Sequence, residues 1–568
     1  MNTIPRPEHP KPQFQRKGFE NLNGEWSFEI DNSKSGKERN LFSADVSLSS
    51  KITVPFCPES KLSGVEHRDF IFGAWYKRSF EIKKERLDGR VFIHFGAVDY
   101  YATVYINGKE IGKHQGGYAS FAFEITDYVR EGENTVALFA EDDTRHPCVP
   151  RGKQCERYLS SGCSYTRTTG IWQTVWLEYT PKSYIKSFRI DTEPESATAF
   201  LSLSLCGCGD LSVKAFFNGK EVGRAVRSGV SGGEKISLSL SEKHLWEVGD
   251  GKLYDLELKF GDDEVKSYFG LRSVSCDNGR LIINGKPHFM RLVLDQGFYP
   301  DGVYTAKDEQ ELIRDINLSL DMGFDGARLH EKVFEERFLY HCDRLGYIVW
   351  EEFPDWGLDI TIPESIYSIL PEWTEIIERD YNHPSIVGWC PHNETRRFTD
   401  KREYDMAINT VYRATKAIDP VRPCIDSSGG LHVESDIFDI HDYDQNPETF
   451  NKRYKRLITE GILEDPLSAN EKYTGGAVFV SEYGGILFDG DESGWGYGET
   501  PKDAQEFISR FIGLADAMLS NKMISGLCYT QLTDVEQEQN GLYTFNREPK
   551  FPPEILSSPL KKKAAIEE

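Results

Sequence analysis

Apolar runs of strand length alternate with amphipathic helical stretches over the second half of the chain, and this alternation constrains the fold most. Eight such runs can be counted, at Phe289–Val293, Gly326–Leu329, Tyr347–Trp350, Ile386–Cys390, Pro423–Asp426, Ile437–Ile440, Ala477–Val480 and Ile524–Tyr529. Helical patterns such as Glu309–Met322 and Lys502–Ser520 fill the intervals. Eight parallel strands separated by helices predict a (β/α)8 TIM barrel over residues 274–568. The interval between the fifth and sixth runs is too short for a proper helix.

The first half of the chain shows a different pattern, with short alternating strands and turns and hardly any helical period. Residues 1–182 contain segments such as Trp26–Ile30 and Trp75–Ile82 together with an Asn107-Gly108 hairpin turn, which predicts a jelly-roll-like β-sandwich. Residues 183–273 repeat the alternation in a shorter stretch of the size of an immunoglobulin-like β-sandwich. We therefore expect a multidomain protein with two β-sandwiches followed by a barrel.

The charge balance bears on the possible partners. The chain has 67 Lys and Arg against 91 Asp and Glu, a net charge of −24, which disfavours nucleic acid and anionic membrane surfaces. No run approaches the roughly 18 apolar residues of a membrane-spanning helix, and the start of the chain lacks the apolar segment of a signal peptide. The eleven cysteines are scattered. We expect a soluble, cytoplasmic protein, although a removed signal peptide would leave no trace.

Two glutamates follow strands of the predicted barrel, at the edge where barrel enzymes place their chemistry. Glu394 comes shortly after the run Ile386–Cys390, and Glu482 comes shortly after Ala477–Val480. Two carboxyl groups that flank a glycosidic bond are what acid catalysis and nucleophilic attack on an acetal carbon require. Spacing alone leaves the alternative that both are solvated or salt-bridged rim residues.

Several motifs in the same order resemble those of family 2 glycoside hydrolases, which include β-galactosidases, β-glucuronidases and β-mannosidases. Asn382–Trp389 with Asn393-Glu394 resembles the acid/base segment of that family, and Phe479–Gly485 resembles its nucleophile segment. Cys528–Leu542 resembles its last barrel strand and the following loop. The resemblance implies a sugar-binding-like β-sandwich, an immunoglobulin-like domain and a catalytic TIM barrel, in this order.

The resemblance also implies roles for individual residues. Glu482 would be the nucleophile and Glu394 the general acid and then the base of a retaining mechanism. Asn393 would bind the 2-hydroxyl of the sugar. Tyr443 would donate a hydrogen bond to Glu482, and Arg328 would favour the charged form of Glu482.

Further residues near the strand ends are candidates for contact with a sugar, namely Asp295, His330, His441 and Trp389. The expected substrate is a terminal sugar of an oligosaccharide or glycoconjugate. The thirteen histidines include no helical His-x-x-x-His pair, and we predict neither a required metal nor a cofactor. A homo-oligomer is left open, because no self-complementary patch can be identified from the sequence.

The sequence favours a retaining exo-β-glycosidase, with a β-galactosidase-like activity as the first interpretation. Departures from the family pattern leave the sugar open, since His392 stands where many members have Gly and His330 belongs to an unusual Arg-Leu-His-Glu segment. Asn546-Arg547-Glu548 replaces the Asn-x-Lys that marks glucuronidases, which lowers the rank of β-glucuronidase. The alternatives are β-glucuronidase, β-mannosidase, β-galactofuranosidase and a non-catalytic carbohydrate-binding protein.

Overall fold

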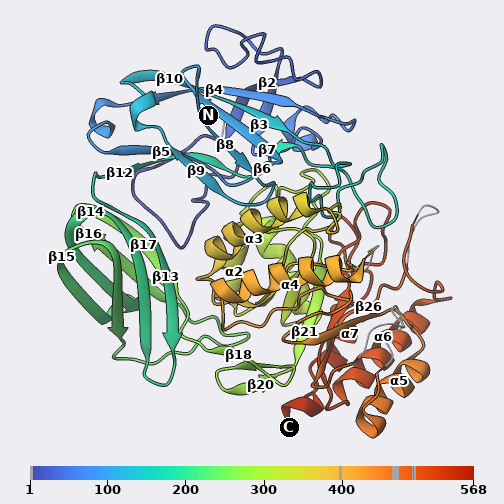
Figure 1. Cartoon of the computed structure of the whole chain (residues 1–568). Coiled ribbons are helices and arrows are strands. Elements are labelled where there is room, and N and C mark those ends of the chain that lie inside the picture. Colours follow the sequence, from blue (N-terminus) through green and yellow to red (C-terminus); the bar gives the residue numbers. More distant parts are fainter. Residues whose placement is uncertain (1–3, 396–399, 464–472, 489, 491–493) are drawn as a thin grey trace.

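The computed structural model describes residues 4–395, 400–463, 473–488, 490 and 494–568. Figure 1 shows three bodies: an N-terminal β-sandwich in blue, an all-β unit in green, and a barrel with its helices in yellow to red. The sandwich lies over one end of the barrel, and the green unit lies beside both.

The N-terminal sandwich consists of two main antiparallel sheets. One has the strand order β1 (Phe19–Asn21), β12 (Val175–Thr180), β5 (Arg90–Phe95) and β9 (Phe121–Glu124). The other has the order β3 (Ser50–Val54), β2 (Gly24–Ile30), β4 (Ala74–Ile82), β10 (Gly132–Glu141), β7 (Tyr101–Ile106) and β8 (Lys109–Gln115). A two-stranded pair, β6 (Val98–Asp99) and β11 (Gly170–Ile171), lies next to them. Asn107 and Gly108 both have positive φ, as the predicted β7–β8 hairpin turn requires.

The second unit is a single antiparallel sheet with very long strands. Its strands are β13 (Tyr184–Glu193), β14 (Thr198–Phe217), β15 (Lys220–Ser239), β16 (Tyr254–Phe260) and β17 (Asp263–Phe269). A small sheet of β18 (Val274–Asp277), β19 (Arg280–Ile283) and β20 (Lys286–His288) leads into the barrel. The alternation of buried and exposed residues along β16 and β14 places one row of aliphatic side chains in the core of this unit.

The barrel has seven parallel strands in one continuous sheet. In chain order these are β21 (Met290–Asp295), β22 (Gly326–Leu329), β23 (Ile348–Glu352), β24 (Ile386–Cys390), β25 (Phe438–Asp442), β26 (Val478–Gly484) and β27 (Ile524–Thr530). The helices are α1 (Glu309–Asp321), α2 (Glu336–Leu345), α3 (Ile366–Asp380), α4 (Lys401–Ile418), α5 (Pro447–Glu460), α6 (Ala504–Leu519) and α7 (Pro553–Leu560). Among the described residues, no helix has both the length and the apolar character needed to cross a membrane.

The fifth predicted strand, Pro423–Asp426, does not form a regular strand. The segment bridges β24 only at single positions, where the Trp389 amide donates to the Pro423 carbonyl and Ile425 donates back to Trp389, each at 3.0 Å. A proline has no amide hydrogen to give to a ladder, which limits pairing here. Residues 419–437 contain no helix, so the short interval noticed in the sequence is an irregular connection.

The interior of the barrel is filled by side chains. Trp350 and Phe479 pack together with Leu292, Ile348 and Cys528 in one buried cluster. A packed interior confines any chemistry to the carboxyl ends of the strands. On the outside, aromatic side chains of the sandwich join the core that the barrel shares with its helices, including Tyr118, Tyr165 and Trp172.

Candidate active site

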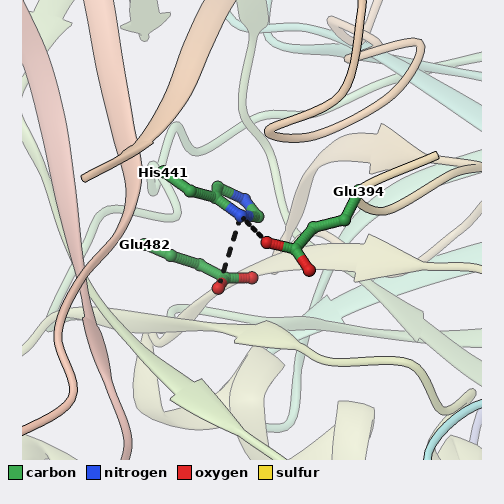
Figure 2. Close-up of side chains that lie close together, drawn as sticks. All are labelled: Glu394, His441 and Glu482. Carbon is green, nitrogen blue, oxygen red and sulfur yellow. Dashed lines mark hydrogen bonds and ion pairs between the residues drawn. The ribbon is translucent and has the colours of Figure 1, made fainter. Parts of the chain in front are cut away.

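Three side chains meet at the carboxyl ends of neighbouring strands, as Figure 2 shows. His441 lies in β25, Glu482 lies opposite it in β26, and Glu394 follows β24. The Nδ1 atom of His441 is 2.8 Å from Glu394 Oε1 and 3.4 Å from Glu482 Oε2. One carboxylate oxygen of each glutamate and this nitrogen all lie within 4.8 Å of one another. The carboxylates of the two predicted glutamates therefore lie close enough together to contact the same glycosidic bond.

Glu394 has an unusual backbone conformation. Its φ is +53°, in the left-handed region that residues with a Cβ seldom adopt, at a cost of about 1–3 kcal/mol. The Glu394 amide donates to the Ser428 carbonyl at 2.7 Å, which helps to hold this conformation. The side chain is 28% exposed, whereas that of Glu482 is 5% exposed. The two carboxyl groups thus have different surroundings, as distinct acid and nucleophile roles require.

Donors surround the carboxylate of Glu482. Arg328 Nη1 lies 3.2 Å from Glu482 Oε1, and the Tyr443 hydroxyl donates to Oε2. Both contacts fix the orientation of the Glu482 carboxylate. The Tyr443 ring stacks on Tyr497 with a centroid distance of 3.6 Å, so the donor is fixed in place. Burial raises the pKa of Tyr443 well above its usual range, and the phenol remains a hydrogen-bond donor.

Arg328 connects the groups of the site. Its Nε lies 2.5 Å from Glu352 Oε1, and its Nη2 donates to Asn393 Oδ1 at 3.1 Å. The Ser481 carbonyl accepts a further bond at 2.7 Å. This use of the Asn393 oxygen orients the amide, and the buried Asn393 Nδ2 has no partner among the described residues. Asn393 therefore keeps an amide N–H donor that no described residue uses.

A chain of hydrogen bonds fixes the proton on His441. Contacts with His432 outweigh burial and lower the pKa of Asp439 to about 2, so Asp439 is a charged acceptor. Ser428 Oγ donates to Asp439 at 2.7 Å and therefore offers only a lone pair to His441 Nε2, 3.2 Å away. A neutral His441 then carries its proton on Nε2, and Nδ1 is an acceptor for a protonated Glu394.

The structure brings most of the predicted residues into one network of contacts, comprising Glu394, Glu482, Asn393, Arg328, His441 and Tyr443. His330 lies one contact further out, with Nδ1 2.8 Å from Glu352 Oε2. Burial, with the charge of Lys153, lowers the pKa of His330 well below its usual range. A neutral His330 supports Glu352, which in turn holds Arg328.

Two predicted sugar contacts lie elsewhere. Trp389 is fully buried, donates its indole N–H to Asp419 at 2.9 Å, and packs edge-on against Trp373. It faces the helices outside β24 and not the barrel mouth, so its predicted contact with a sugar is wrong. Asp295 accepts the amide of Gly297 at 2.9 Å, and burial raises its pKa to about 6. No described contact joins Asp295 to the two glutamates.

Three residues of this region were not predicted from the sequence. Glu352 ends β23 and anchors Arg328. It stands two residues after the predicted run Tyr347–Trp350, so a search for titratable groups after this third run would have found it. Tyr497 clamps Tyr443 from a loop whose shape the sequence does not show. Lys153 comes from the N-terminal sandwich and has no signal in its local sequence. Its ammonium lies 3.5 Å from the centroid of the Trp356 ring.

The described residues contain one group with the spacing of a metal site, and it is the same trio of Glu394, His441 and Glu482. An imidazole nitrogen and two carboxylates fit a borderline cation such as Zn²⁺. A cation there would occupy the oxygens that face each other across the gap. The prediction that no metal is required stays a prediction.

A parallel barrel with two facing carboxylates at its mouth, oriented by arginine, tyrosine and histidine, defines the class of glycoside hydrolases. Comparison with protein families agrees. The sugar binding domain of glycosyl hydrolases family 2 matches residues 19–146, and the TIM barrel domain of the same family matches residues 274–489. The chain belongs to glycoside hydrolase family 2, and it is a glycosidase.

Named relatives carry two activities. The β-glucuronidase of Rattus norvegicus is 27% identical over 71% of this chain and 67% of its own length. A β-galactosidase of Thermoanaerobacter pseudethanolicus is 29% identical over 57% of this chain and 45% of its own length. The structure of Ruminococcus gnavus β-glucuronidase in complex with D-glucuronic acid has a TM-score of 0.80 at 18% identity, covering 97% of this chain and 99% of that one. This last likeness concerns the fold.

Proposed function

We propose that this family 2 glycosidase is a retaining exo-β-glycosidase, with Glu482 as the nucleophile and Glu394 as the acid and base. The observation that carries the proposal is the separation of the two carboxylates, whose nearest oxygens lie within 4.8 Å. Retaining enzymes place these groups about 5–5.5 Å apart, whereas inverting enzymes need about 6.5–9.5 Å to admit a water. The gap supports direct attack by a carboxylate on the anomeric carbon.

Each step of the reaction has a residue with suitable surroundings. Glu482, oriented by hydrogen bonds from Arg328 and Tyr443, attacks the anomeric carbon, and the bond to the leaving oxygen breaks. Glu394 gives its proton to that oxygen; before the reaction, the protonated Glu394 keeps this proton and donates a hydrogen bond with it to His441 Nδ1. Glu394 then removes a proton from water, and the water oxygen displaces Glu482 from the sugar.

The sugar has two candidates. The β-galactosidase-like activity favoured by the sequence remains the first, and a relative named β-galactosidase supports it. The second is hydrolysis of a β-glucuronide, which relatives named β-glucuronidase support. Arg547, in the segment that replaces Asn-x-Lys, is paired with Asp315 and bonded to the Phe298 carbonyl. This pairing leaves Arg547 in a structural contact.

The decisive experiment measures initial rates on 4-nitrophenyl β-galactoside, β-glucuronide, β-mannoside and β-galactofuranoside. We expect one substrate to be hydrolysed by the wild type and the activity to fall at least about 10⁴-fold in Glu482→Gln. Glu394→Gln should spare the first step with 2,4-dinitrophenyl glycosides, whose leaving group needs no proton, so a burst of dinitrophenolate should precede slow turnover, because the base that activates water is missing. Glu403→Gln, on the exposed face of α4, is the matched control.

Proton NMR of the first product gives the stereochemistry independently. A β-anomer appearing before mutarotation supports retention. An α-anomer, or full activity in Glu482→Gln, would contradict the proposed roles. If none of the 4-nitrophenyl glycosides is hydrolysed but free sugars bind, the non-catalytic carbohydrate-binding alternative is favoured.

A further inference from the structure

The connection between β10 and β11 of the sandwich reaches the barrel mouth. Residues 142–169 form no helix or strand, and long connections of this kind in a compact domain are usually functional. Tyr165 donates its hydroxyl to Glu538 at 2.5 Å, and Gln537 donates to the carbonyls of Gly162 and Ser164. The connection is therefore fastened to the loop that follows β27.

Lys153 occupies a fixed position on this connection. Its carbonyl accepts the amide of Tyr165 at 2.7 Å. The preceding residue, Gly152, donates to the carbonyl of Trp356 at 3.2 Å. The Lys153 ammonium lies over the Trp356 ring, and the indole N–H of Trp356 donates to the carbonyl of Asn393, next to Glu394. The lysine is thus one aromatic ring away from the backbone of the acid/base residue.

The donors of this ammonium are unused within the part of the chain that the structure describes. Lys153 is 5% exposed, and its Nζ has no hydrogen bond or ion pair to a described residue, the Trp356 ring being its recorded contact. An ammonium in this position has up to three N–H donors to offer to a ligand. Arg328, the other cation of the site, already serves Glu352, Glu482 and Asn393.

The surrounding charges keep Lys153 protonated. Burial would lower its pKa, but Cys163 and the carboxyl groups of Glu538, Glu331 and Glu482 outweigh burial, and the pKa is raised. Lys153 therefore carries its positive charge at neutral pH.

We propose that Lys153 is a substrate-binding residue supplied by the sandwich, and that its acceptor is the carboxylate of a terminal β-linked uronic acid. This inference rests on the proposed exo-β-glycosidase function and favours its second candidate. A charged, fixed ammonium with three unused donors matches a carboxylate better than a neutral hydroxyl, because hydrogen bonds between two charged partners are about twice as strong.

The test compares 4-nitrophenyl β-glucuronide with 4-nitrophenyl β-galactoside for the wild type, Lys153→Met and Lys153→Arg. In Lys153→Met we expect kcat/KM on the glucuronide to fall at least about 50-fold while the galactoside changes less than about 3-fold. Lys153→Arg should recover part of the loss. Lys61→Met, at an exposed lysine of the same sandwich, is the control and should leave both values unchanged.

An unchanged ratio of the two kcat/KM values would overturn the inference. If both values fall equally, Lys153 only supports the fold. Calorimetric binding separates it from the catalytic proposal. In Glu482→Gln we expect free D-glucuronate to bind at least about tenfold more tightly than D-galactose, and the added Lys153→Met change should abolish this preference. If Lys153→Met leaves the affinity for D-glucuronate unchanged, the inference is overturned, even if hydrolysis is never observed.

Discussion

Glu59 gives the sandwich a pH-dependent stability whose size follows from its surroundings. It is 1% exposed, Oε2 accepts the amide of Thr169 at 3.1 Å, and Oε1 has no partner among the described residues. Burial raises its pKa from 4.5 to about 7. A pKa difference of one corresponds to about 1.4 kcal/mol, so the folded state gains about 3 kcal/mol below pH 4.5. This stabilisation is lost as the pH rises through 7.

Glu59→Gln removes the ionisation and keeps the shape. We expect the variant to match the wild type at pH 4.5 and to exceed it by about 3 kcal/mol above pH 7. For a domain of this size the gain corresponds to about 6–12 °C in the melting temperature of the sandwich, which calorimetry at pH 5 and pH 8 can measure. Glu85→Gln, at an exposed position, is the control. The reasoning is refuted if the difference between variant and wild type is the same at both pH values.

Three further predictions concern the catalytic centre. Tyr443→Phe removes a hydrogen bond to a carboxylate, which is worth about 1.5–3 kcal/mol. The value of kcat/KM should therefore fall about 10- to 150-fold. A loss below about 3-fold would show that Tyr443 does not hold the nucleophile. Ser428→Ala removes the hydrogen-bond acceptor that keeps the His441 proton on Nε2. Because alkyl leaving groups need the proton of Glu394, steady-state rates should fall about tenfold more for alkyl glycosides than for 2,4-dinitrophenyl glycosides. Equal losses would contradict this role of Ser428. Millimolar Zn²⁺ should inhibit competitively by binding Glu394, His441 and Glu482, and EDTA should restore full activity, whereas inactivation by EDTA would reveal a required metal.

The barrel could be predicted from the sequence because its strands are local apolar runs. Gly326–Leu329 and Ile386–Cys390 were predicted with the bounds that β22 and β24 have. The fifth strand failed because Pro423 limits pairing, which an apolar count does not register. In the second unit, the alternating segments Leu201–Leu205 and Ser212–Phe217, which read in the sequence as separate short strands, are parts of the single strand β14, whose backbone continues through bulges near Gly207.

The meeting of Glu394 and Glu482 was also predictable, because parallel barrel strands bring their carboxyl ends to one rim. That rule gives their positions, whereas their proposed catalytic roles came from the resemblance of the surrounding motifs to family 2 glycoside hydrolases. Trp389 was misplaced because the pairing of β23 with β24 shifts register between Val349 and Trp350, which interrupts the simple alternation of sides along β24. Ile386 and Trp389, three residues apart, both pack toward the helices, while Val387 packs into the barrel interior. A residue can lie near a strand end and still point away from the mouth.

Lys153 marks where prediction from the sequence stops, because its position depends on how two distant parts of the chain pack. On the proposed function, the barrel supplies the groups that make and break bonds, and strand register fixes their positions. On the inference above, the sandwich supplies the cation that selects the sugar, and it is fixed by contacts such as Tyr165 with Glu538. The chemistry and the choice of sugar are then separable: changes in the connection 142–169 should alter which glycoside is hydrolysed and leave the two-carboxylate mechanism intact. Barrel motifs alone therefore identify a glycosidase of this family without naming its sugar.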